Sequence, residues 1–462
     1  MKRNRTIFYS ALIAVCFFYT GSAYMSQSYR LMAWYDPLTV DLITSVGNYL
    51  FQAAGIALFS LGLRKAPSVF GKRRLFAVLL AAGVFFMAVT QLSENAAAVC
   101  GAGYVFNLLI GTYFGYYLTM LAQYVPPRRM GTAFGAAYAA ASVGTYLLSR
   151  IRGGEFLVSR AVTAVYCILA AAVIALVLAA DDIGPAACAE RLAGKASEHA
   201  NERIPDCAQE QPALFRYLIP VIALMTVISV IGSELFYSLP VAESVNWTQI
   251  RAFYAVGLIL AGLILDRRRL IGEIIVIGTL VYPLIFSALV GEGVTGMAAM
   301  TFSYIFRGFL TIYYVVSFTE PCASDPARLP TAPLGLLTSR AVEGILSLLL
   351  LLAPVPPAAK LIAGAVCFLP LLVVFVLMQL AKRPAAPPSF EQRLAAFSDR
   401  YLLTAREAEI LTCLREGMTD TEIAEKLFIS KTTVRYHISN LLKKTETSSR
   451  TEVVRALEQA GR

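Results

Sequence analysis

The feature that most limits the possible fold is a series of long apolar runs. About 20 residues of α-helix are needed to cross the hydrocarbon core of a bilayer, and runs of this length recur up to about residue 381. Twelve can be counted, at residues 6–27, 39–63, 73–92, 97–124, 130–149, 160–180, 214–239, 249–265, 271–290, 295–318, 331–353 and 358–381. The sequence therefore predicts an all-α fold, dominated by a polytopic bundle of twelve transmembrane helices.

Composition favours a membrane protein over a soluble enzyme. Hydrophobic residues make up 57% of the 462 residues and charged residues only 15%, whereas soluble domains carry about 25% charged residues. The eight cysteines show no paired spacing and the chain has two histidines, so we expect no metal and no cofactor. No nucleophile, base and orienting group occur together, and we therefore expect no enzymatic activity.

A polar stretch at residues 181–211 divides the runs into two sets of six. Lysine and arginine accumulate in cytoplasmic loops, and here they precede the first run and follow runs two, four and eight. This pattern predicts a multi-pass protein of the bacterial inner membrane with both termini in the cytoplasm. Arg150, Arg152 and Arg160, between runs five and six, break the pattern. They either form an outer vestibule for an anion or lie among lipid headgroups.

Two loops repeat a pattern of glycine followed by basic residues. The clusters are Gly62, Gly71, Lys72, Arg73 and Arg74 after run two, and Gly262, Asp266, Arg267, Arg268 and Arg269 after run eight. Glycine allows a helix to end tightly, and the basic residues suit the anionic inner surface. Together with the two sets of six, this pattern resembles the major facilitator superfamily over residues 1–381. Arg64 and Lys65 depart from the resemblance, because that family often has an acidic residue in the first of these loops.

Charged and amide side chains inside the runs suggest a ligand site, since each charge in lipid costs about 2.5–3.5 kcal/mol on insertion scales. The candidates are Arg307, Arg340, Glu343, Glu234 and Asn107, with Asn48 and Gln52 as further polar points. Two interpretations stay open. Arg340 and Glu343 neutralise each other while Glu234 caps its helix, or a central pocket with a cationic excess from Arg307 binds a small anionic ligand. The aromatic residues considered for its lining are Tyr113, Tyr116, Tyr117, Tyr304, Tyr313 and Tyr314.

After Gln379 the composition changes to a proline-rich segment. Pro384, Pro387 and Pro388 prevent the last membrane helix from continuing and favour an extended spacer. We therefore predict a linker at residues 382–398. At about 3.1 Å per residue, roughly 15 such residues reach at most about 45 Å.

Residues 399–462 read as a small helical domain. Thr404 with Glu407 and Thr419 with Glu422 have the spacing of capping boxes, which begin helices. Ser430 and Ser449 mark the starts of a third and a fourth helix, and Gly417 ends the first. Two short helices before a basic one predict a helix-turn-helix that binds nucleic acid.

The segment from Leu403 resembles the LuxR-type helix-turn-helix. The matching residues are Leu403, Thr404, Arg406, Glu407, Glu409, Leu411, Gly417, Glu422, Ile423, Ala424, Leu427, Ser430, Thr433, Val434, His437, Leu442, Lys444 and Arg450. The resemblance implies that the third helix reads the major groove of double-stranded DNA. It places Arg435, Tyr436 and Ser439 at bases. The remaining implied contacts, nearer phosphates, are Lys431, Thr432, Thr433, Lys443 and Lys444.

Other residues of this domain read as scaffold. We expect an ion pair of Glu407 with Arg450, and a packed His437 with no catalytic role. Thr445 and Thr447 stand where the family usually has Leu and Val. This departure weakens the join to the fourth helix, which pairs two domains on DNA in that family, so homodimerisation is expected to depend on the membrane portion.

Taken together, these features predict a membrane-bound one-component transcription regulator. Its membrane portion (1–381) senses a small ligand and contacts lipid, and its C-terminal domain (399–462) binds DNA as a homodimer. Two alternatives remain at this point. One is a secondary transporter with a DNA-binding regulatory tail, and the other is a constitutive DNA tether without a ligand.

Overall fold

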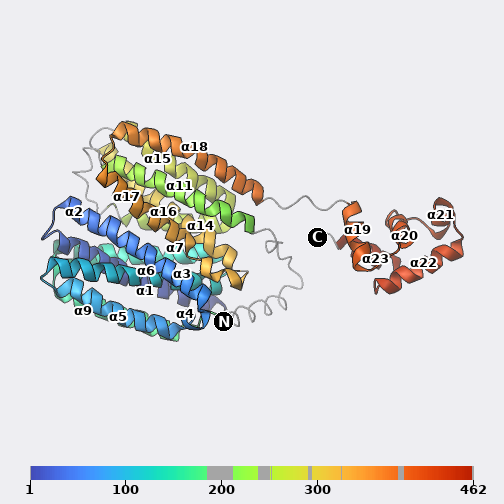
Figure 1. Ribbon diagram of the computed structural model, residues 1–462, viewed down its shortest axis with the longest axis horizontal. Coiled ribbons are helices and arrows are strands. Elements are labelled where there is room, and N and C mark those ends of the chain that lie inside the picture. Colours follow the sequence, from blue (N-terminus) through green and yellow to red (C-terminus); the bar gives the residue numbers. More distant parts are fainter. Residues whose placement is uncertain are drawn as a thin grey trace. The chain divides into compact units, whose positions relative to one another are not determined.

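The computed structural model describes residues 2–184, 212–237, 250, 252–289, 294–323, 325–382 and 390–459. All regular structure in these ranges is helical, which confirms the predicted all-α class. The chain divides into two compact units, Met1–Leu380 and Ala381–Arg462 (Figure 1), called here the membrane unit and the tail unit. Most of the polar stretch, residues 185–211, lies outside the described ranges.

The first half of the membrane unit contains helices at all six predicted runs. They are α1 (Lys2–Leu31), α2 (Pro37–Asp41) continuing through the π-helix η1 (Leu42–Gly47) into α3 (Asn48–Lys65), α5 (Arg73–Leu92), α6 (Ala96–Tyr124), α7 (Met130–Arg150) and α9 (Ala161–Ala179). Short turns of helix connect them, namely α4 (Pro67–Phe70), η2 (Pro127–Arg129), η3 (Ile151–Gly154) and α8 (Glu155–Val158).

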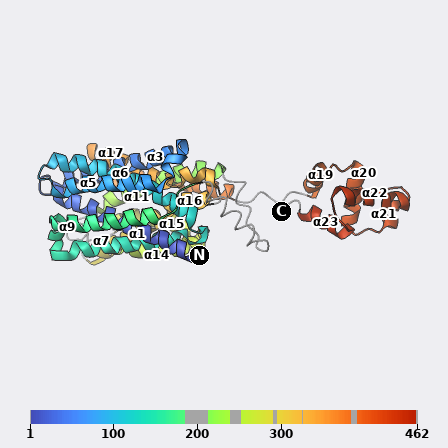
Figure 2. The ribbon, with the colours of Figure 1, turned by 90° about the horizontal axis from the view of Figure 1, so that it is seen from below.

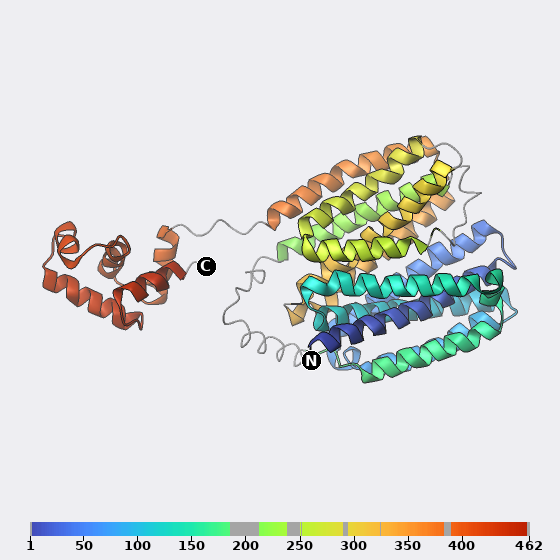
Figure 3. The same ribbon diagram turned by 180° about the vertical axis from the view of Figure 1, so that it is seen from behind.

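The second half follows the same plan. Its helices are α11 (Pro212–Tyr237), α14 (Tyr254–Arg267), α15 (Arg269–Leu289), α16 (Val294–Cys322), α17 (Leu334–Leu352) after the turn η4 (Pro326–Thr331), and α18 (Pro357–Ala381). Figures 2 and 3 show the long helices of both halves running roughly along one common direction, as in a bundle that crosses a bilayer.

Ten helices of the described residues are long and apolar enough to cross a membrane, which confirms a multi-pass protein. Runs five and eight also fold as helices, α7 and α14, but are not among these ten. Helix α7 is long enough at 21 residues but is rich in alanine, glycine, serine and threonine. The described part of α14 has 14 residues. The total of twelve spans therefore stays a prediction.

The two halves meet where α3 packs on α17 and α7 packs on α14. At the second contact the backbones are very close, because a Cβ on Gly262 would collide with the carbonyl oxygen of Gly131. Asp266 fixes this contact electrostatically. Its Oδ1 accepts a hydrogen bond from Gly131 N at 2.8 Å and its Oδ2 accepts one from Thr132 N at 2.7 Å. These N–H groups have no partner within α7, and the carboxylate suits the positive end of the helix dipole.

The halves also repeat one internal helix crossing. In the first half α3 and α6 touch at Gly55 and Gly111, and in the second half α14 and α16 touch at Gly257 and Gly308. A Cβ at any of these four positions would collide with the backbone of the facing helix. The same contact between runs two and four and between runs eight and ten supports the predicted pair of six-helix halves.

The tail unit contains the four predicted helices. They are α20 (Ala405–Arg415), α21 (Asp420–Lys426), α22 (Lys431–Lys444) and α23 (Arg450–Gln459). Both capping boxes are formed, Thr404 with Glu407 and Thr419 with Glu422. Gly417, at φ +78°, ends the first helix in the left-handed conformation that glycine adopts without strain. The predicted helix-turn-helix is therefore confirmed.

A fifth helix differs from the predicted linker at residues 382–398. Helix α19 (Phe390–Arg400) packs against α23, and Phe397 on it is 1% exposed within the apolar core of the tail unit. Phe390, Leu394 and Tyr401 also pack against that core. The interval between α18 and α19 is consequently the eight residues 382–389.

The glycine contact between the halves gives a stability test. We expect Gly262→Val to destabilise the membrane unit by about 1–3 kcal/mol, because overpacking forces α7 and α14 apart. Gly101→Val is the matched control, since a Cβ there meets nothing within 4 Å. Thermal unfolding in detergent measures both. Equal melting temperatures of the two variants would contradict the close contact.

Candidate functional site

Helix α22 has one apolar face in the core of the tail unit and one polar face in solvent. Val434, Ile438 and Leu441 are buried. The exposed side chains are Lys431, Thr432, Arg435, Tyr436, Ser439 and Lys443. Residues three or four apart share one side of a helix, so these exposed residues form a continuous polar and basic strip, called here the α22 strip.

Two residues predicted to lie near phosphates have contacts inside the tail unit instead. Thr433 is half-buried, and its hydroxyl lies 2.8 Å from the Ser430 hydroxyl that caps the helix. The Lys444 ammonium lies 2.7 Å from the Glu407 carboxylate and donates to the Leu402 carbonyl oxygen at 2.9 Å. Both side chains therefore stabilise the scaffold beneath the α22 strip in this structure.

The predicted ion pair of Glu407 with Arg450 is wrong. Glu407 pairs with Lys444, whereas Arg450 pairs with Asp420 at 2.6 Å from Nη2 to Oδ1. Asp420, the first residue of α21, also accepts a hydrogen bond from Arg435 Nε at 3.0 Å. The expectation failed because Glu407 lies at the capped start of α20, where the end of α22 reaches it and the start of α23 does not. One carboxylate thus joins α21, α22 and α23.

Both carboxylates of these pairs have lowered pKa values. Burial alone would raise the pKa of Asp420, but its hydrogen bonds from Arg435 and Arg450 outweigh burial and hold the pKa below 3.8. Burial would likewise raise the pKa of Glu407, but the Lys444 ammonium and the N–H and hydroxyl of Thr404 hold it below 4.5. Both groups are therefore charged at neutral pH.

The hydroxyl groups of Thr445 and Thr447, just after α22, lie within hydrogen-bond distance of each other. Thr445 is 5% exposed, and its hydroxyl donates to the Leu441 carbonyl oxygen at 2.8 Å and lies 2.9 Å from the Thr447 hydroxyl. These bonds offset the cost of burying a hydroxyl group. These hydrogen bonds add no apolar contact with α23. The weakened contact between the end of α22 and α23 stays a prediction.

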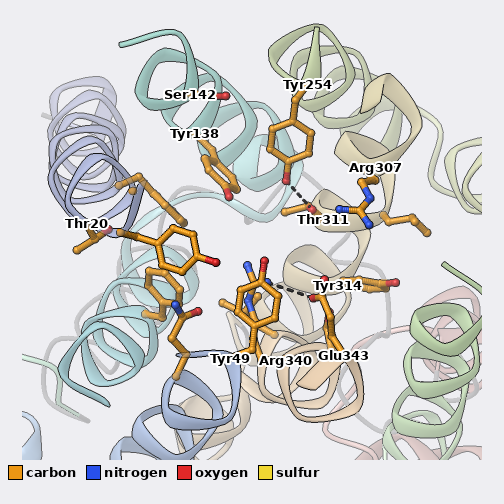
Figure 4. A pocket seen from close by; sticks show the side chains of 18 of the residues that line it. Thr20, Tyr49, Tyr138, Ser142, Tyr254, Arg307, Thr311, Tyr314, Arg340 and Glu343 are labelled. Atoms are coloured by element: carbon orange, nitrogen blue, oxygen red, sulfur yellow. Dashed lines mark hydrogen bonds and ion pairs between the residues drawn. The ribbon is translucent and has the colours of Figure 1, made fainter. Parts of the chain in front are cut away.

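A cavity of ≈ 280 Å³ lies between the two halves of the membrane unit. Its lining comes from α1, α3, α6 and α7 of the first half and from α11, α14, α16 and α17 of the second. Figure 4 shows Tyr49, Arg340 and Glu343 close together on one side of the space, with Tyr254, Thr311 and Arg307 across from them. The cavity is lined by aromatic rings, by hydroxyl groups and by the charged side chains of Arg307, Arg340 and Glu343.

Arg340 joins the two halves at the cavity. Its Nη1 lies 3.2 Å from Glu343 Oε2 on the same helix, α17. Its guanidinium also stacks on the Tyr49 ring of α3, 4.4 Å from the ring centroid. An attractive contact between a guanidinium and an aromatic face is strongest where water is scarce. The predicted pairing of Arg340 with Glu343 is thus present, and both residues still line the cavity.

The other predicted ligand residues divide into two groups. Arg307 lines the cavity and donates through Nη2 to the Ser233 hydroxyl at 2.5 Å. Glu234 is not among the lining residues, and its carboxylate lies 3.3 Å from the Lys360 ammonium of α18. Asn107 is fully buried behind the lining, where its Oδ1 accepts a hydrogen bond from Gln52 Nε2 at 2.7 Å.

The comparison with known proteins identifies the tail unit. Residues 401–457 match the family described as bacterial regulatory proteins, luxR family. Spore germination protein GerE of Bacillus subtilis is 43% identical over 65 residues, which are 14% of this chain and 88% of that protein. The chain belongs to the luxR family of bacterial regulatory proteins.

Longer relatives of this luxR-family chain match over a short part of their length. The probable csgAB operon transcriptional regulatory protein of Salmonella typhimurium is 42% identical over 77 residues. The CsgBAC operon transcriptional regulatory protein of Escherichia coli has the same identity over the same length. The match covers 14% of this chain and 36% of each relative, so the chain spans about a third of their length.

The membrane unit is similar to solved transporters in fold. The major facilitator superfamily transporter FucP, in the outward conformation, has a TM-score of 0.52 and 13% identity, covering 82% of this chain and all of that chain. The proton:xylose symporter XylE has a TM-score of 0.56 and 12% identity, covering 82% of this chain and 96% of that one. At such identities only the fold is shown, and it is the fold that the sequence predicted.

The tyrosines of the cavity were largely missed from the sequence of this luxR-family chain. Of those considered, Tyr304 and Tyr314 line the cavity, whereas the others pack between helices: Tyr113, Tyr116, Tyr117 and Tyr313. The lining tyrosines that were not considered are Tyr24, Tyr49, Tyr138, Tyr146 and Tyr254. Helical periodicity signals a buried face, but it does not tell a packed tyrosine from one beside a cavity.

Arg150, Arg152 and Arg160 are not among the lining residues of the cavity. Arg160 forms an exposed ion pair with Glu94, with 2.9 Å between Nη2 and Oε1. Within the described ranges, no group of three histidine, cysteine, aspartate or glutamate residues is arranged to hold a metal ion. Among the described residues, the cavity and the α22 strip are the two places where charged and polar side chains gather beside a hollow or on one helix face.

The lowered pKa of Glu407 predicts acid sensitivity of the tail unit. A carboxylate whose folded pKa is depressed contributes stability above its unfolded pKa, here 4.5, and that stability is lost as the pH falls through the folded value. We expect residues 381–462 to lose stability progressively below about pH 5. Glu407→Gln is expected to be less stable at pH 7 and less sensitive to acid.

Urea unfolding of residues 381–462 at pH 7, 5 and 3 measures this effect. Glu458→Gln, at an exposed position of α23, is the control and is expected to keep the pH dependence of the parent. An unchanged acid dependence in Glu407→Gln would show that the pair with Lys444 does not contribute.

Proposed function

We propose that this chain is a membrane-bound transcription regulator that binds double-stranded DNA through α22 and senses a small ligand in its membrane unit. The observation that carries the proposal is a luxR-family helix-turn-helix in one chain with a transporter-like bundle. A helix-turn-helix supplies the output, and the bundle, with a cavity between two halves, supplies the input.

The α22 strip supports DNA as the partner. A major groove about 12 Å wide admits one α-helix, and α22 presents its exposed residues along one side. Lys431 and Lys443 suit phosphates at either end of the helix, and Arg435 suits a base edge between them. Two of the relatives are named as transcriptional regulators of an operon, which agrees with this partner.

Orientation follows from where DNA is found. The tail unit meets DNA only in the cytoplasm, and the basic residues beside runs two, four and eight favour the same side. The eight residues 382–389 between α18 and α19 are called here the tether. Eight residues span at most about 30 Å even when fully extended. We therefore place the protein in the bacterial inner membrane with the DNA-binding domain close beneath it.

The cavity supports sensing of a small anion. Among the described residues that line it, two guanidinium groups, of Arg307 and Arg340, face one carboxylate, of Glu343. A ligand shifts an equilibrium only if it binds one conformation more tightly than another. Because Arg340 contacts Tyr49 across the junction of the halves, an anion that draws the guanidinium away from this ring favours a different arrangement of α3 and α17.

A path for this change leads toward the tail unit. Gln379, two residues before the end of α18, donates to Glu273 at 2.6 Å. Glu273 in turn accepts from Arg269 Nε at 3.0 Å. Movement of α15 within the second half therefore displaces the end of α18, the helix that precedes the tether. We propose that ligand binding changes how two tail units pair on DNA as a homodimer.

Genome-wide mapping of DNA occupancy by the intact protein tests the output. Arg435→Ala is expected to remove occupancy at specific sites, because one bidentate contact with a base contributes about 1–3 kcal/mol of discrimination. Arg455→Ala, an exposed arginine of α23 outside the α22 strip, is the matched control. Occupancy that persists at the same sites in Arg435→Ala would reject α22 as the reading helix.

Reporter expression across a panel of small organic anions tests the input. We expect Arg307→Ala and Arg340→Ala to raise the effective concentration of an active anion about tenfold or more, since a charged hydrogen bond contributes about 1.5–3 kcal/mol. Lys360→Ala removes a basic group outside the cavity and serves as the control. Unchanged responses in both arginine variants would reject the cavity as the sensor. Uptake of the active anion into vesicles would favour the alternative, a transporter with a regulatory tail.

A further inference from the structure

Asp420 receives two arginines of different exposure. Its side chain is 16% exposed, that of Arg450 is 44% exposed and that of Arg435 is 72% exposed. Arg450 occupies Oδ1 at 2.6 Å, and Arg435 occupies Oδ2 through Nε at 3.0 Å. Arg450 therefore fixes the carboxylate from the scaffold side, and the carboxylate in turn holds an arginine of the α22 strip.

The Arg435 nitrogen that contacts Asp420 determines which N–H groups of the guanidinium are left to contact DNA. A guanidinium group has five N–H donors in a planar fork, one of them on Nε. Because the contact with Asp420 is made through Nε, the outer edge with both terminal nitrogens points away from the carboxylate. Two terminal N–H groups match the O6 and N7 acceptors of guanine, the commonest base contact of arginine.

Holding Arg435 in place also lowers the cost of reading a base. A free arginine side chain loses rotamer entropy when it is fixed in one conformation. A side chain that is already ordered before binding loses less, which is the general advantage of preorganisation. A flexible cation of the same charge attracts phosphates equally well, so ordering matters for base selection rather than for general affinity.

We propose that Asp420 is a positioning residue that presents the outer edge of Arg435 to a guanine in the major groove. This inference rests on the proposed role of α22 in DNA binding and adds a specificity determinant outside that helix. Asp420 touches no base. It acts through Arg435, while its contact with Arg450 keeps the carboxylate in place.

The test uses the full-length protein in lipid nanodiscs. Sequences are selected from a pool of randomised duplex DNA, and affinities are then measured for the selected duplex and for single-base variants of it. Arg435→Ala identifies the guanine that depends on Arg435. Asp420→Asn is then expected to lower the preference for guanine at that position about threefold to tenfold, a part of the discrimination that one bidentate contact provides.

Two further variants separate positioning from a merely structural role. Arg450→Gln removes the scaffold side of the cluster and leaves Asp420 with Arg435, so we expect a smaller loss of guanine preference than in Asp420→Asn. In an Arg435→Lys background, which lacks the fork, Asp420→Asn is expected to change the base preference no further. This comparison holds even if Asp420→Asn lowers the melting temperature of the tail unit, because preference is a ratio of affinities of the same folded protein.

Three outcomes of these measurements would overturn the proposed role of Asp420. An unchanged guanine preference in Asp420→Asn overturns the proposal, and so does an equal loss of preference in Arg450→Gln. An effect of Asp420→Asn that persists in the Arg435→Lys background also overturns it, because Asp420 would then act without Arg435. If the parent protein selects no sequence at all, the proposed DNA-binding function fails first, which distinguishes the two failures.

Discussion

The cavity of the membrane unit depends on the contact of α7 with α14. Gly131 and Gly262 bring the two backbones together, and the Asp266 carboxylate binds the first free N–H groups of α7 across the junction. Without a close contact here and between α3 and α17, the lining from the two halves would not enclose a common space. A ligand in that space necessarily touches both halves. The same geometry that forms the site therefore links its occupancy to the arrangement of the halves.

One charged cluster in the second half surrounds the buried carboxylate of Glu273. Arg269 lies 3.0 Å from Glu273 and 3.0 Å from Glu320, so α15 and α16 share its charge. Glu273, which is 1% exposed, also accepts the hydrogen bond from Gln379 of α18. Removing one member of such a cluster leaves an uncompensated charge, which costs far more than an exposed pair contributes. The cluster thus ties the end of α18 to two other helices of its half.

Local rules predicted most of the helices of this chain, because apolar runs and capping residues act over a few positions. Thr404 and Thr419 cap their helices as the sequence indicates. Helix α19 lies mostly within the predicted linker at residues 382–398, although Phe390, Leu394, Phe397 and Tyr401 follow helical spacing. The nearby prolines indicate an extended spacer, and that signal outweighs the short helical pattern. An amphipathic helix of 11 residues is stable mainly through the core it joins, and that core is not visible in its own sequence.

The ion-pair partners of individual side chains were predicted less well than the helices that carry them. Arg340 and Glu343 are neighbours on one helix, so their pairing could be read from a spacing of three. The partners of Glu407 and Glu234 lie 37 and 126 residues away, at Lys444 and Lys360. Several basic residues compete for each carboxylate, and the choice between them depends on how helices cross. The cavity lining has the same origin, since it joins residues of eight helices.

In the proposed homodimer, the short interval of residues 382–389 lowers the strength that a contact between two tail units requires. Thr445 and Thr447 lie within hydrogen-bond distance of each other, and the Thr445 hydroxyl donates to the Leu441 carbonyl oxygen of α22. If two chains pair as proposed, a weak contact between their tail units is sufficient, because a short link gives an effective concentration in the millimolar range. Two tail units beneath paired membrane units would meet this condition. Control then requires no change within the helix-turn-helix, because a change in the distance or orientation of two tethers alters their joint binding to DNA.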